Sequence, residues 1–522
     1  MTLSLKRILW VDDEIDLLKP HLLFLRDRGY YVDAITNGDD ALVLLERHNY
    51  DLLLLDEQMP GRSGLEILDL VRKTNLGIRV IMVTKSEEDR TMKEAIGRRA
   101  DDYLLKPVSP LQVLYAVTRI LEGPSIRQEH VARDFAGQFS ALSHRLERAA
   151  TERDFAELYI ELTDWHVRLE HSNEGGLLGT VEALLVGLRK DFGSWIKSEY
   201  PQWMQGKMEG RPSLSVDVVE KHLIPLLGES SVMFVLLDCL RMDQWKVIAP
   251  LLVPYFEIQE SYHYSILPTA TPYCRNAIFS GGFPDDLPEH YRQGVGISGE
   301  KVGLNGFEDK LLKNHLEALC GQSIPVHYEK ITSDENGGRV RARVRSALKE
   351  PRSVVVTVFN FVDMMTHGRS DSTILMEVAR DEAALRSLTR SWFERSNAFS
   401  VMRDAAAAGH RILLTSDHGS IQCRNPTVIH AKKDASSSLR YKVGMDLRLD
   451  NPETTFLTKV GKNLRLPPAP LGTSYAIALD DHYFVYPNRL REYQRRYRNS
   501  FLHGGISPEE MIVPVVELKS RT

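Results

Sequence analysis

Short apolar runs alternate with stretches of helical spacing in two separate parts of the chain, residues 1–122 and 206–522. Alternation of this kind is typical of a parallel sheet covered by helices. Residues 123–205, which lie between these parts, carry helical spacing alone. Because 522 residues are also more than one core usually holds, the sequence predicts an α/β protein with three domains: a small doubly wound domain, a helical bundle and a large α/β domain.

Polar residues end the predicted strands of the first domain. We expect strands at Arg7–Val11, Tyr31–Ile35, Leu52–Leu55, Val80–Val83 and Tyr103–Leu105. Asp12 and Asp13 follow the first strand, and Asp56 follows the third. Thr84 follows the fourth strand and Lys106 the fifth. These side chains would converge at the carboxyl edge of one sheet, where three carboxylates bind Mg²⁺ and the hydroxyl and ammonium groups hold the oxygens of a phosphoryl group.

The segment from Asp56 to Gly64 resembles the phosphoacceptor loop of the response-regulator receiver family. The resemblance implies a flavodoxin-like fold in which Asp56 accepts a phosphoryl group from a sensor histidine kinase. It also implies that Asp12, Asp13 and the backbone carbonyl of Gln58 hold Mg²⁺ together with Asp56. The alternative is a set of strand-end acids without a shared function.

Three further residues match the switch of the receiver family. Thr84 matches its hydroxyl residue, Tyr103 its aromatic residue and Lys106 its lysine, and the resemblance implies a cis bond between Lys106 and Pro107. Phosphorylation of Asp56 would shift the domain between two states. We expect that shift to promote homodimerisation.

The middle part of the chain has apolar residues at alternating steps of three and four. They are Phe135, Phe139, Leu142, Leu146 and Ala149, then Phe155, Leu158, Leu162, Trp165 and Leu169, then Val181, Leu184, Leu188, Phe192 and Trp195. This spacing predicts the amphipathic helices of a small bundle, either a spacer with its own core or a transmission or dimerisation element. No helix carries the clustered basic residues of a DNA-recognition helix, which disfavours a transcription-factor output.

Seven chemically reactive residues are scattered over the large α/β domain, each close to a predicted strand end or helix start. The strands are expected at Val232–Leu237, Val354–Val358, Arg411–Thr415, Tyr483–Tyr486 and Met511–Val516. The seven residues are Asp238, Thr271, Asp363, His367, Asp417, His418 and His503. Three carboxylates, three imidazoles and one hydroxyl are what two Zn²⁺-like ions and a nucleophile require.

Local spacing suggests how these residues would divide between two ions. Asp363 and His367 are four residues apart, so they can face the same ion from one helical turn. Asp417 and His418 are adjacent and should point apart, which makes it easier for them to serve different ions. Gly419 would let the backbone leave this pair in an unusual conformation.

Thr271 has the position of a nucleophile. Because Pro272 suits the first position of a helix, we expect Thr271 to be the N-cap, beside free backbone N–H groups that favour phosphate. Coordination to a metal would lower the pKa of the hydroxyl and yield an alkoxide. Two divalent ions and three aspartates leave one positive charge, which also favours a phosphoryl substrate.

The order of these residues resembles the alkaline phosphatase superfamily, in particular its PglZ branch and the nucleotide pyrophosphatase/phosphodiesterases. The resemblance implies one zinc ion on Asp238, Thr271, Asp417 and His418, and a second on Asp363, His367 and His503. It also implies a covalent phospho-intermediate on Thr271, with Arg275 and Asn276 as candidates to bind the non-bridging oxygens. Since no extra acidic cluster suggests a third, Mg²⁺-type site, we expect diesters, of nucleotide type, as substrates.

Two insertions, at about 281–350 and 424–480, are expected to form caps over the metals. Lys432, Lys433 and Arg440 in the second insertion would either bind a polyanionic substrate or form a solvated basic surface.

The order of domains resembles PorX-type response regulators. This resemblance implies a PorY-like sensor kinase, a role in type IX secretion, and contacts with a sigma factor or a component of the secretion machinery. A non-catalytic, metal-containing signalling scaffold that binds such a partner is the alternative to an enzyme. Direct DNA binding is the weakest alternative, because the net charge is -5.

Cysteine spacing and the lengths of apolar stretches indicate the cellular compartment in which the protein is expected. The four cysteines form no CxxC pair, so a disulfide framework is not expected. The first residues lack the apolar stretch of a signal peptide, and no apolar run is long enough to cross a bilayer. We therefore expect a cytoplasmic protein without membrane insertion.

Overall fold

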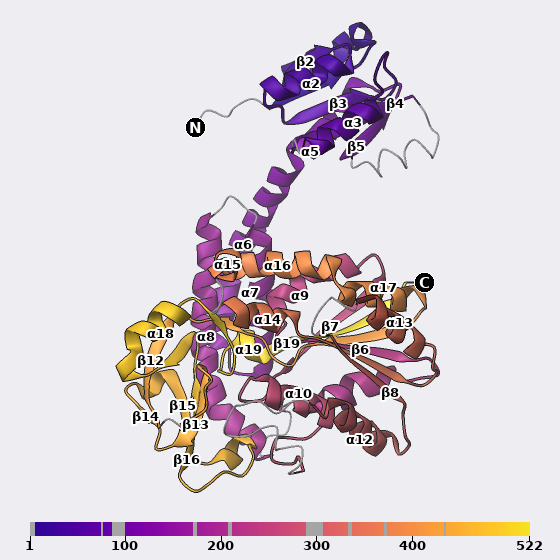
Figure 1. Ribbon diagram of the computed structural model, residues 1–522. Helices are drawn as coiled ribbons and strands as arrows, with labels where there is room; N and C mark the ends of the chain where they lie inside the picture. Colours follow the sequence, from indigo (N-terminus) through magenta and orange to yellow (C-terminus); the bar gives the residue numbers. More distant parts are fainter. Residues whose placement is uncertain are drawn as a thin grey trace. The chain divides into compact units, whose positions relative to one another are not determined.

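The computed structural model describes residues 6–74, 77–85, 100–170, 175–206, 211–288, 306–331, 337–369, 373–432 and 435–521. The chain divides into two compact units, Met1–Asp134 and Phe135–Thr522 (Figure 1). The long helix α6 (Gly123–Arg148) crosses this division.

The first unit contains a five-stranded parallel sheet in the order β2-β1-β3-β4-β5. Its strands are β1 (Arg7–Val11), β2 (Tyr31–Ile35), β3 (Leu52–Asp56), β4 (Arg79–Thr84) and β5 (Asp102–Leu105). The helices described are α1 (Lys19–Asp27), α2 (Gly38–Arg47), α3 (Gly64–Lys73) and α5 (Pro110–Leu121). The alternating residues of β3 enter separate apolar cores on the two faces of the sheet, which is why its whole length is apolar. The predicted doubly wound fold is confirmed.

The middle of the chain forms three helices, α6, α7 (Glu152–Leu169) and α8 (Gly175–Met204). Thr151 and Asp154 form a capping box that starts α7. Most residues of the predicted apolar stripes are buried, including Phe135, which lies 5.4 Å from the ring of Trp165. Phe139 is 38% exposed, so the stripe of α6 is only partly covered.

The second unit is built on a six-stranded sheet in the order β7-β19-β10-β6-β9-β8. Its strands are β6 (Val232–Leu237), β7 (Phe256–Tyr264), β8 (Val326–Ile331), β9 (Val354–Phe359), β10 (Arg411–Thr415) and β19 (Ile512–Ser520). β10, β6, β9 and β8 run parallel, as expected. β19 is antiparallel to both of its neighbours, β10 and β7, which corrects the expectation of an entirely parallel sheet. Tyr483–Tyr486 is not part of this sheet either, because β17 (His482–Val485) pairs with β12 (Asn425–His430) in a small separate sheet.

Helices cover both faces of the six-stranded sheet. α10 (Thr271–Ser280) and α12 (Glu308–Cys320) pack on one face, against alternate residues of β6 and β9. α9 (Met242–Leu252), α16 (Glu382–Arg395) and α17 (Asn397–Ala407) lie on the opposite face (Figure 1). Every residue of β6 and β9 is buried, so the residues that follow these central strands start from fixed positions.

The two predicted insertions have different structures. Residues 281–350 contain α12, the edge strand β8 and the helix α13 (Gly337–Ala347), so this segment extends the main fold as well as its surface. Residues 424–480 form small sheets that include β12, β13 (Tyr441–Met445), β15 (Thr455–Thr458) and β16 (Thr473–Ala478). Arg440 is fully buried there and pairs with Glu510 at 2.5 Å, so it is not available to a substrate. Lys432 pairs with Asp446 at the surface, and Lys433 lies outside the described residues.

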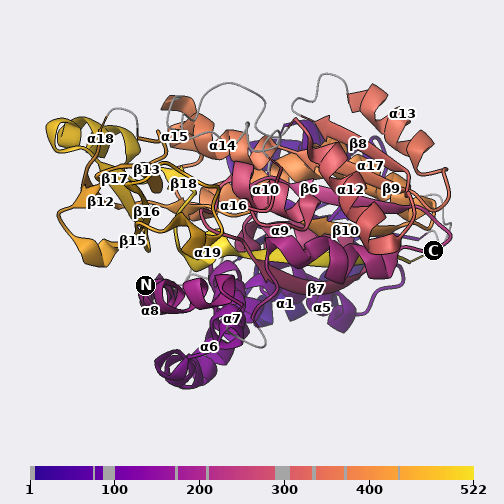
Figure 2. The same ribbon diagram turned by 90° about the horizontal axis from the view of Figure 1, so that it is seen from below.

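The helices α7 and α8 pack directly on the large α/β domain (Figure 2). The Tyr264 hydroxyl donates a hydrogen bond of 2.6 Å to the backbone carbonyl of Glu152. The ring of Phe192 stacks on that of Tyr264, with centroids 6.2 Å apart. The bundle therefore shares a core with the large domain.

Within the described ranges, no helix is long and apolar enough to cross a bilayer.

Candidate phosphoacceptor site and metal centre

The predicted phosphoacceptor residues meet at the carboxyl edge of the first sheet. Asp12 and Asp13 follow β1, Asp56 ends β3, and oxygens of all three carboxylates lie within 4.8 Å of one another. Asp12 and Asp56 are buried, whereas Asp13 is exposed. Three converging carboxylate oxygens of this kind fit Mg²⁺.

Lys106 neutralises part of this negative charge. Its Nζ lies 2.8 Å from Asp12 Oδ2 and 2.9 Å from Asp56 Oδ2. Burial raises the pKa of the Asp56 carboxyl, the Lys106 ammonium opposes this shift, and the charge of Asp12 adds to it. The bond between Lys106 and Pro107 is cis, as the resemblance implied. Lys106 is thus placed against the carboxylate that would be phosphorylated.

The switch residues lie beside the same loop. Thr84 ends β4, and its hydroxyl donates a short hydrogen bond to the carboxylate of Glu57, a contact that the sequence had not suggested. Tyr103 is half-buried against the apolar core. Gln58 is exposed, and its backbone N–H donates to Asp56. The role of its carbonyl toward Mg²⁺ stays a prediction.

A first ligand group of the large domain forms where β6 and β10 end. Asp238 follows β6, and Asp417 and His418 follow the neighbouring strand β10. One ligand atom from each lies within 4.8 Å of the others, and all three side chains are buried. Adjacency therefore does not keep the ligand atoms of Asp417 and His418 apart, and both could serve one ion; which ion each residue serves stays a prediction.

Hydrogen bonds fix which nitrogen of His418 is available. Nδ1 lies 3.1 Å from the carbonyl oxygen of Gly419, so Nδ1 carries the proton and donates it. Nε2 then presents its lone pair, and it lies 3.0 Å from Thr271 Oγ1. A histidine held through one nitrogen by a backbone carbonyl is the usual arrangement of a metal ligand.

The second ligand group shows the same arrangement. Nδ1 of His503 lies 3.2 Å from the carbonyl oxygen of Thr269, and Nε2 lies 3.6 Å from Asp363 Oδ1. Asp363 lies in the first turn of α14 (Phe361–Arg369). The rings of His503 and His418 stack with centroids 4.3 Å apart, so the two groups adjoin. The backbone of His367 is part of α14, but the His367 side chain lies outside the described part of the structure.

Thr271 lies in the first turn of α10, one residue later than the N-cap position expected for it. The N-cap is Ala270, whose backbone is extended, and Thr271 is the first residue of the helix. Its hydroxyl still lies at the helix N-terminus, where free N–H groups favour an anion. The neighbouring hydroxyl of Thr269 donates to the carbonyl oxygen of Gly505 at 2.7 Å, so Thr269 is engaged elsewhere.

Arg275 lies behind the first ligand group. It is fully buried, and its guanidinium forms ion pairs with Asp238 and, at 3.0 Å, with Asp417 Oδ2. Glu308 of α12 lies 3.6 Å from the same guanidinium. Arg275 thus faces these two carboxylates, and not solvent, from which a substrate would come. Asn276 donates to the carbonyl oxygen of Pro272 at 3.0 Å, and its contact with a substrate stays a prediction.

The charges of this cluster shift the pKa values of the two carboxyls in opposite directions. Burial raises the pKa of Asp238 well above its usual range, and Arg275 only partly opposes this effect. Burial also acts on Asp417, but there Arg275 and His418 outweigh it and lower the pKa. A further positive charge beside Asp238 would favour its ionised form.

The donors that the structure describes are of the kind that Zn²⁺ binds. Oδ1 of Asp238 is buried without a hydrogen-bond partner, and each described histidine directs Nε2 toward a carboxylate or hydroxyl. Oxygen and imidazole nitrogen are ligands that Zn²⁺ prefers. The charge count made from the sequence included two divalent ions and three aspartates but left out Arg275 and Glu308. The opposite charges of these two residues cancel, so the count of one remaining positive charge is unchanged.

One further cluster escaped the sequence reasoning. Asp480, Asp481 and His482 bring ligand atoms within 4.8 Å of one another between β16 and β17. The Asp481 carboxylate accepts a hydrogen bond of 2.7 Å from Asn425, and burial raises the pKa of Asp480 to about 6. The hydrogen bond from Asn425, which begins β12, gives Asp481 a structural role.

Comparison with known proteins divides the chain in the same way. Residues 8–118 match the response regulator receiver domain, 125–204 the PorX response regulator linker domain, and 218–518 the BREX system PglZ alkaline phosphatase-like domain.

Individual relatives match the first part of the chain. The transcriptional regulatory protein ResD of Bacillus subtilis is 34% identical over 119 residues, which are 23% of this chain and 49% of ResD. The nitrate/nitrite response regulator protein NarL of Escherichia coli is 35% identical over 127 residues, 24% of this chain and 56% of NarL. The chain thus spans about half the length of these relatives.

Solved structures match the same segment. A CheY-like receiver domain protein from Methanospirillum hungatei is 32% identical, with a TM-score of 0.22, over 23% of this chain and 96% of its own. The chemotaxis protein CheY4 of Vibrio cholerae is 27% identical, with a TM-score of 0.22, over 23% of this chain and 100% of its own. The partner expected of a receiver domain is a sensor kinase. With its receiver, linker and PglZ domains, the chain belongs to the PglZ family of alkaline phosphatase-like proteins and has the domain set of a PorX-type response regulator.

Proposed function

We propose that this protein is a two-component response regulator in which phosphorylation of Asp56 controls a dizinc phosphodiesterase. The observation that carries the proposal is the contact between Thr271 Oγ1 and His418 Nε2 at 3.0 Å. It places a hydroxyl at a helix N-terminus against the lone pair of a buried histidine that is grouped with two carboxylates.

The residues that would hold the ions are Asp238, Thr271, Asp417 and His418 for one zinc, and Asp363, His367 and His503 for the other. When bound, the two Zn²⁺ ions would supply Lewis-acid stabilisation of the charge that develops on the phosphoryl oxygens and would lower the pKa of a hydroxyl. The buried, unpartnered Oδ1 of Asp238 supports the first of these positions.

Thr271 would act as the nucleophile. Its oxygen forms a bond to phosphorus while the bond from phosphorus to the leaving alcohol breaks, and the two oxygens exchange protons with solvent. Water then attacks the phosphothreonine, which releases the phosphate ester and restores the hydroxyl. The N-terminus of α10 favours the negative phosphoryl group in both steps.

The substrate class that we propose is a phosphodiester of nucleotide type. Among the residues that the structure describes, no additional carboxylate is grouped with Asp238, Asp417 and His418. A third metal of the kind used by phosphomonoesterases therefore has no support there. The PglZ family membership supports a hydrolase of the phosphatase superfamily more generally.

The receiver, linker and PglZ domains suggest the biological role that we propose. A PorY-like sensor kinase would phosphorylate Asp56, the phosphorylated protein would form a homodimer in the cytoplasm, and the output would be regulation of type IX secretion. The alternative is a metal-containing scaffold that binds a sigma factor or a secretion component without turnover. Detection of a reaction product separates the two.

The test of the hydrolase uses three forms of the full chain: wild type, Thr271→Ser and Thr271→Val. Each is loaded with Zn²⁺ and assayed with bis(p-nitrophenyl) phosphate, and bound zinc is measured by elemental analysis. We expect Thr271→Val to lose turnover while it retains most of its zinc, and Thr271→Ser to keep measurable activity because it keeps the hydroxyl. Full activity of Thr271→Val would remove the assigned nucleophile.

The test of the regulation compares wild type with Asp56→Ala after treatment with acetyl phosphate and Mg²⁺. Sedimentation velocity should show a dimer for wild type alone. Equal dimerisation of the two proteins would contradict the proposed switch.

A further inference from the structure

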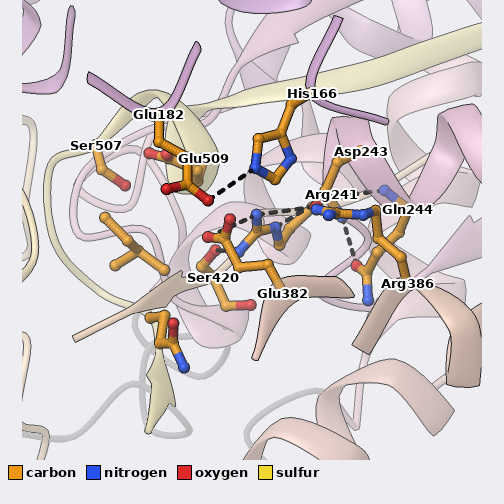
Figure 3. A network of polar contacts seen from close by, with 12 residues as sticks. His166, Glu182, Arg241, Asp243, Gln244, Glu382, Arg386, Ser420, Ser507 and Glu509 are labelled. Atoms are coloured by element: carbon orange, nitrogen blue, oxygen red, sulfur yellow. Dashed lines mark hydrogen bonds and ion pairs between the residues drawn. The ribbon is translucent and has the colours of Figure 1, made fainter. Parts of the chain in front are cut away.

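Buried charged side chains lie between the bundle and the loops that carry the metal ligands (Figure 3). Arg189, Arg241, Asp243, Arg386 and Glu509 are each at most 8% exposed. A buried charge costs free energy unless it is paired. The pairs formed by these residues therefore fix how the bundle helices sit against the loops of the large domain.

The first contact joins α8 to the loop after β10. Arg189 Nε donates to Glu509 Oε1 at 2.5 Å, and Glu509 belongs to the short helix α19 (Pro508–Met511). The backbone of Glu509 touches Gly419, since a Cβ atom added to Gly419 would lie only 1.9 Å from the Glu509 carbonyl oxygen. The Gly419 N–H donates to the next carbonyl, that of Glu510, at 3.0 Å. Arg189 is thereby linked to the residue that follows the metal ligand His418.

The second contact joins the end of α7 to the same loop. Arg386 of α16 donates two hydrogen bonds to Glu170 Oε2, at 2.9 and 2.8 Å, and one to Asp243 at 2.8 Å. Asp243 accepts two hydrogen bonds from Arg241, at 2.8 and 3.0 Å. Arg241 Nη1 in turn donates to the carbonyl oxygen of Ser420 at 3.2 Å. Four charged residues thus connect the bundle to the loop after β10.

The third contact reaches the loop that leads to the nucleophile. The hydroxyl oxygen of Tyr200, a fully buried residue of α8, accepts a hydrogen bond from the Leu267 N–H at 2.9 Å. Leu267 precedes Thr271 by four residues, and α10 starts at Thr271. The bundle therefore contacts the loop before Thr271 directly, and it is linked to the loop after β10 through intermediate side chains.

From these contacts we infer that α7 and α8 help to position the ligands of the proposed metal centre in the large α/β domain. Arg189, Glu170 and Tyr200 are the positioning residues, and displacement of the bundle changes the geometry of the metal ligands. The inference rests on the proposed function and names the regulation of that same site. A loop held by buried ion pairs has few alternative arrangements, and small changes around metal ligands lower metal affinity about 10- to 100-fold.

The test compares four full-length variants with wild type: Arg189→Gln, Arg189→Lys, Glu509→Gln and the double variant Arg189→Gln/Glu509→Gln. Lys190→Gln is the matched control, because Lys190 is the next residue of α8, carries the same charge and is exposed. Zn²⁺ affinity is measured by competition with a chromophoric chelator. The visible absorption of the Co²⁺-loaded protein reports ligand geometry, and kcat and KM are measured with bis(p-nitrophenyl) phosphate.

Arg189→Gln should bind Zn²⁺ about tenfold more weakly, shift the Co²⁺ bands and lower kcat more than it raises KM. Arg189→Lys should recover most of the affinity because it keeps the charge. The double variant should be no worse than the worse single variant, since both changes break one pair. Lys190→Gln should match wild type in every measurement.

A folded Arg189→Gln protein with the Zn²⁺ affinity and Co²⁺ spectrum of wild type would overturn the inference. If Arg189→Gln does not fold, Glu170→Gln decides in its place, because it breaks the second contact at a half-buried residue; unchanged affinity and spectrum would again overturn the inference. Wild-type protein that binds Zn²⁺ but cleaves no diester would refute the proposed hydrolase while the affinity and spectral comparison still stands. Wild-type protein that binds neither ion would refute both.

Discussion

The carbonyl oxygen of Glu509 lies against Gly419 at the place where any other residue would carry its Cβ atom. The distance from that position to the oxygen is 1.9 Å, and to the Glu509 carbonyl carbon 3.1 Å. The sequence suggested that Gly419 allows an unusual backbone conformation, but it is not among the glycines with positive φ. The glycine is required for close approach of two backbone segments.

Gly419→Ala should therefore destabilise the second unit by about 3 kcal/mol or more, because backbone atoms have to move to admit the methyl group. Gly193→Ala is the matched contrast. Gly193 lies within α8, where a Cβ atom would meet Leu479 at an ordinary distance of 3.6 Å. Alanine should stabilise this helix by roughly 0.5 to 1 kcal/mol. Urea unfolding of the two variants checks both signs, and a Gly419→Ala protein as stable as wild type would contradict the close approach.

Arg275→Met should destabilise the metal-free protein by about 3 to 5 kcal/mol, because Asp238 and Asp417 would lose the cation buried beside them. Zinc would supply positive charge at the same carboxylates, so it should raise the unfolding temperature more in Arg275→Met than in wild type. Differential scanning fluorimetry with and without ZnCl₂ measures this difference. Arg489→Met, which changes an exposed arginine, is the control, and an equal effect of zinc on all three proteins would argue against the arrangement.

His263 should make the second unit sensitive to mild acid. Burial lowers the pKa of this histidine to about 3, and neither ring nitrogen has a hydrogen-bond partner. Below pH ~6.5 the unfolded chain binds a proton that the folded chain does not, so stability falls with decreasing pH by about 1.4 kcal/mol per pH unit. His263→Leu should remove roughly 2 kcal/mol of the loss between pH 6.5 and 5.

Unfolding free energies at these two pH values check this expectation. His144→Leu, at an exposed histidine of α6, should leave the pH dependence unchanged. The same slope in wild type and His263→Leu would show that other groups cause the acid sensitivity.

Glu57→Gln should speed phosphorylation of Asp56 by a small phosphodonor about two- to fivefold. The carboxylate of Glu57 adds negative charge next to the phosphoacceptor and engages the Thr84 hydroxyl, and its removal lowers the repulsion of an incoming phosphoryl anion. Phosphate-affinity electrophoresis after addition of acetyl phosphate and Mg²⁺ measures the rate. Glu46→Gln, an exposed change on α2, should behave as wild type; a slower reaction of Glu57→Gln would refute the expected role of this charge.

The central strands and the residues that follow them could be predicted because these strands are buried on both faces. β6, β9 and β10 appear as continuous apolar runs, and Asp238, Asp363 and Asp417 follow them directly or within a few residues. β7 and β8 were missed because they are edge strands whose exposed positions carry polar residues. The antiparallel direction of β19 was missed because an apolar run contains no information on strand direction.

The surroundings of the proposed metal ligands could not be predicted from the sequence for a related reason. Arg275 was identified, but as a substrate contact, since nothing in its local sequence reveals two carboxylates that come from strands far away in the chain. Glu308 comes from a segment expected to be a cap. Contacts between distant segments become visible only when the fold brings them together.

The shared core of α7, α8 and the large domain determines where this protein can be recombined with others. A chimera that receives a foreign receiver should keep its own chain from Phe135 onward, with the joint inside α6. A joint placed after Met204 would discard Arg189 and Tyr200 along with the bundle. Such a chimera would contain every proposed metal ligand but would lack the helices that contact the loop before Thr271 and, through Glu509, the loop after β10.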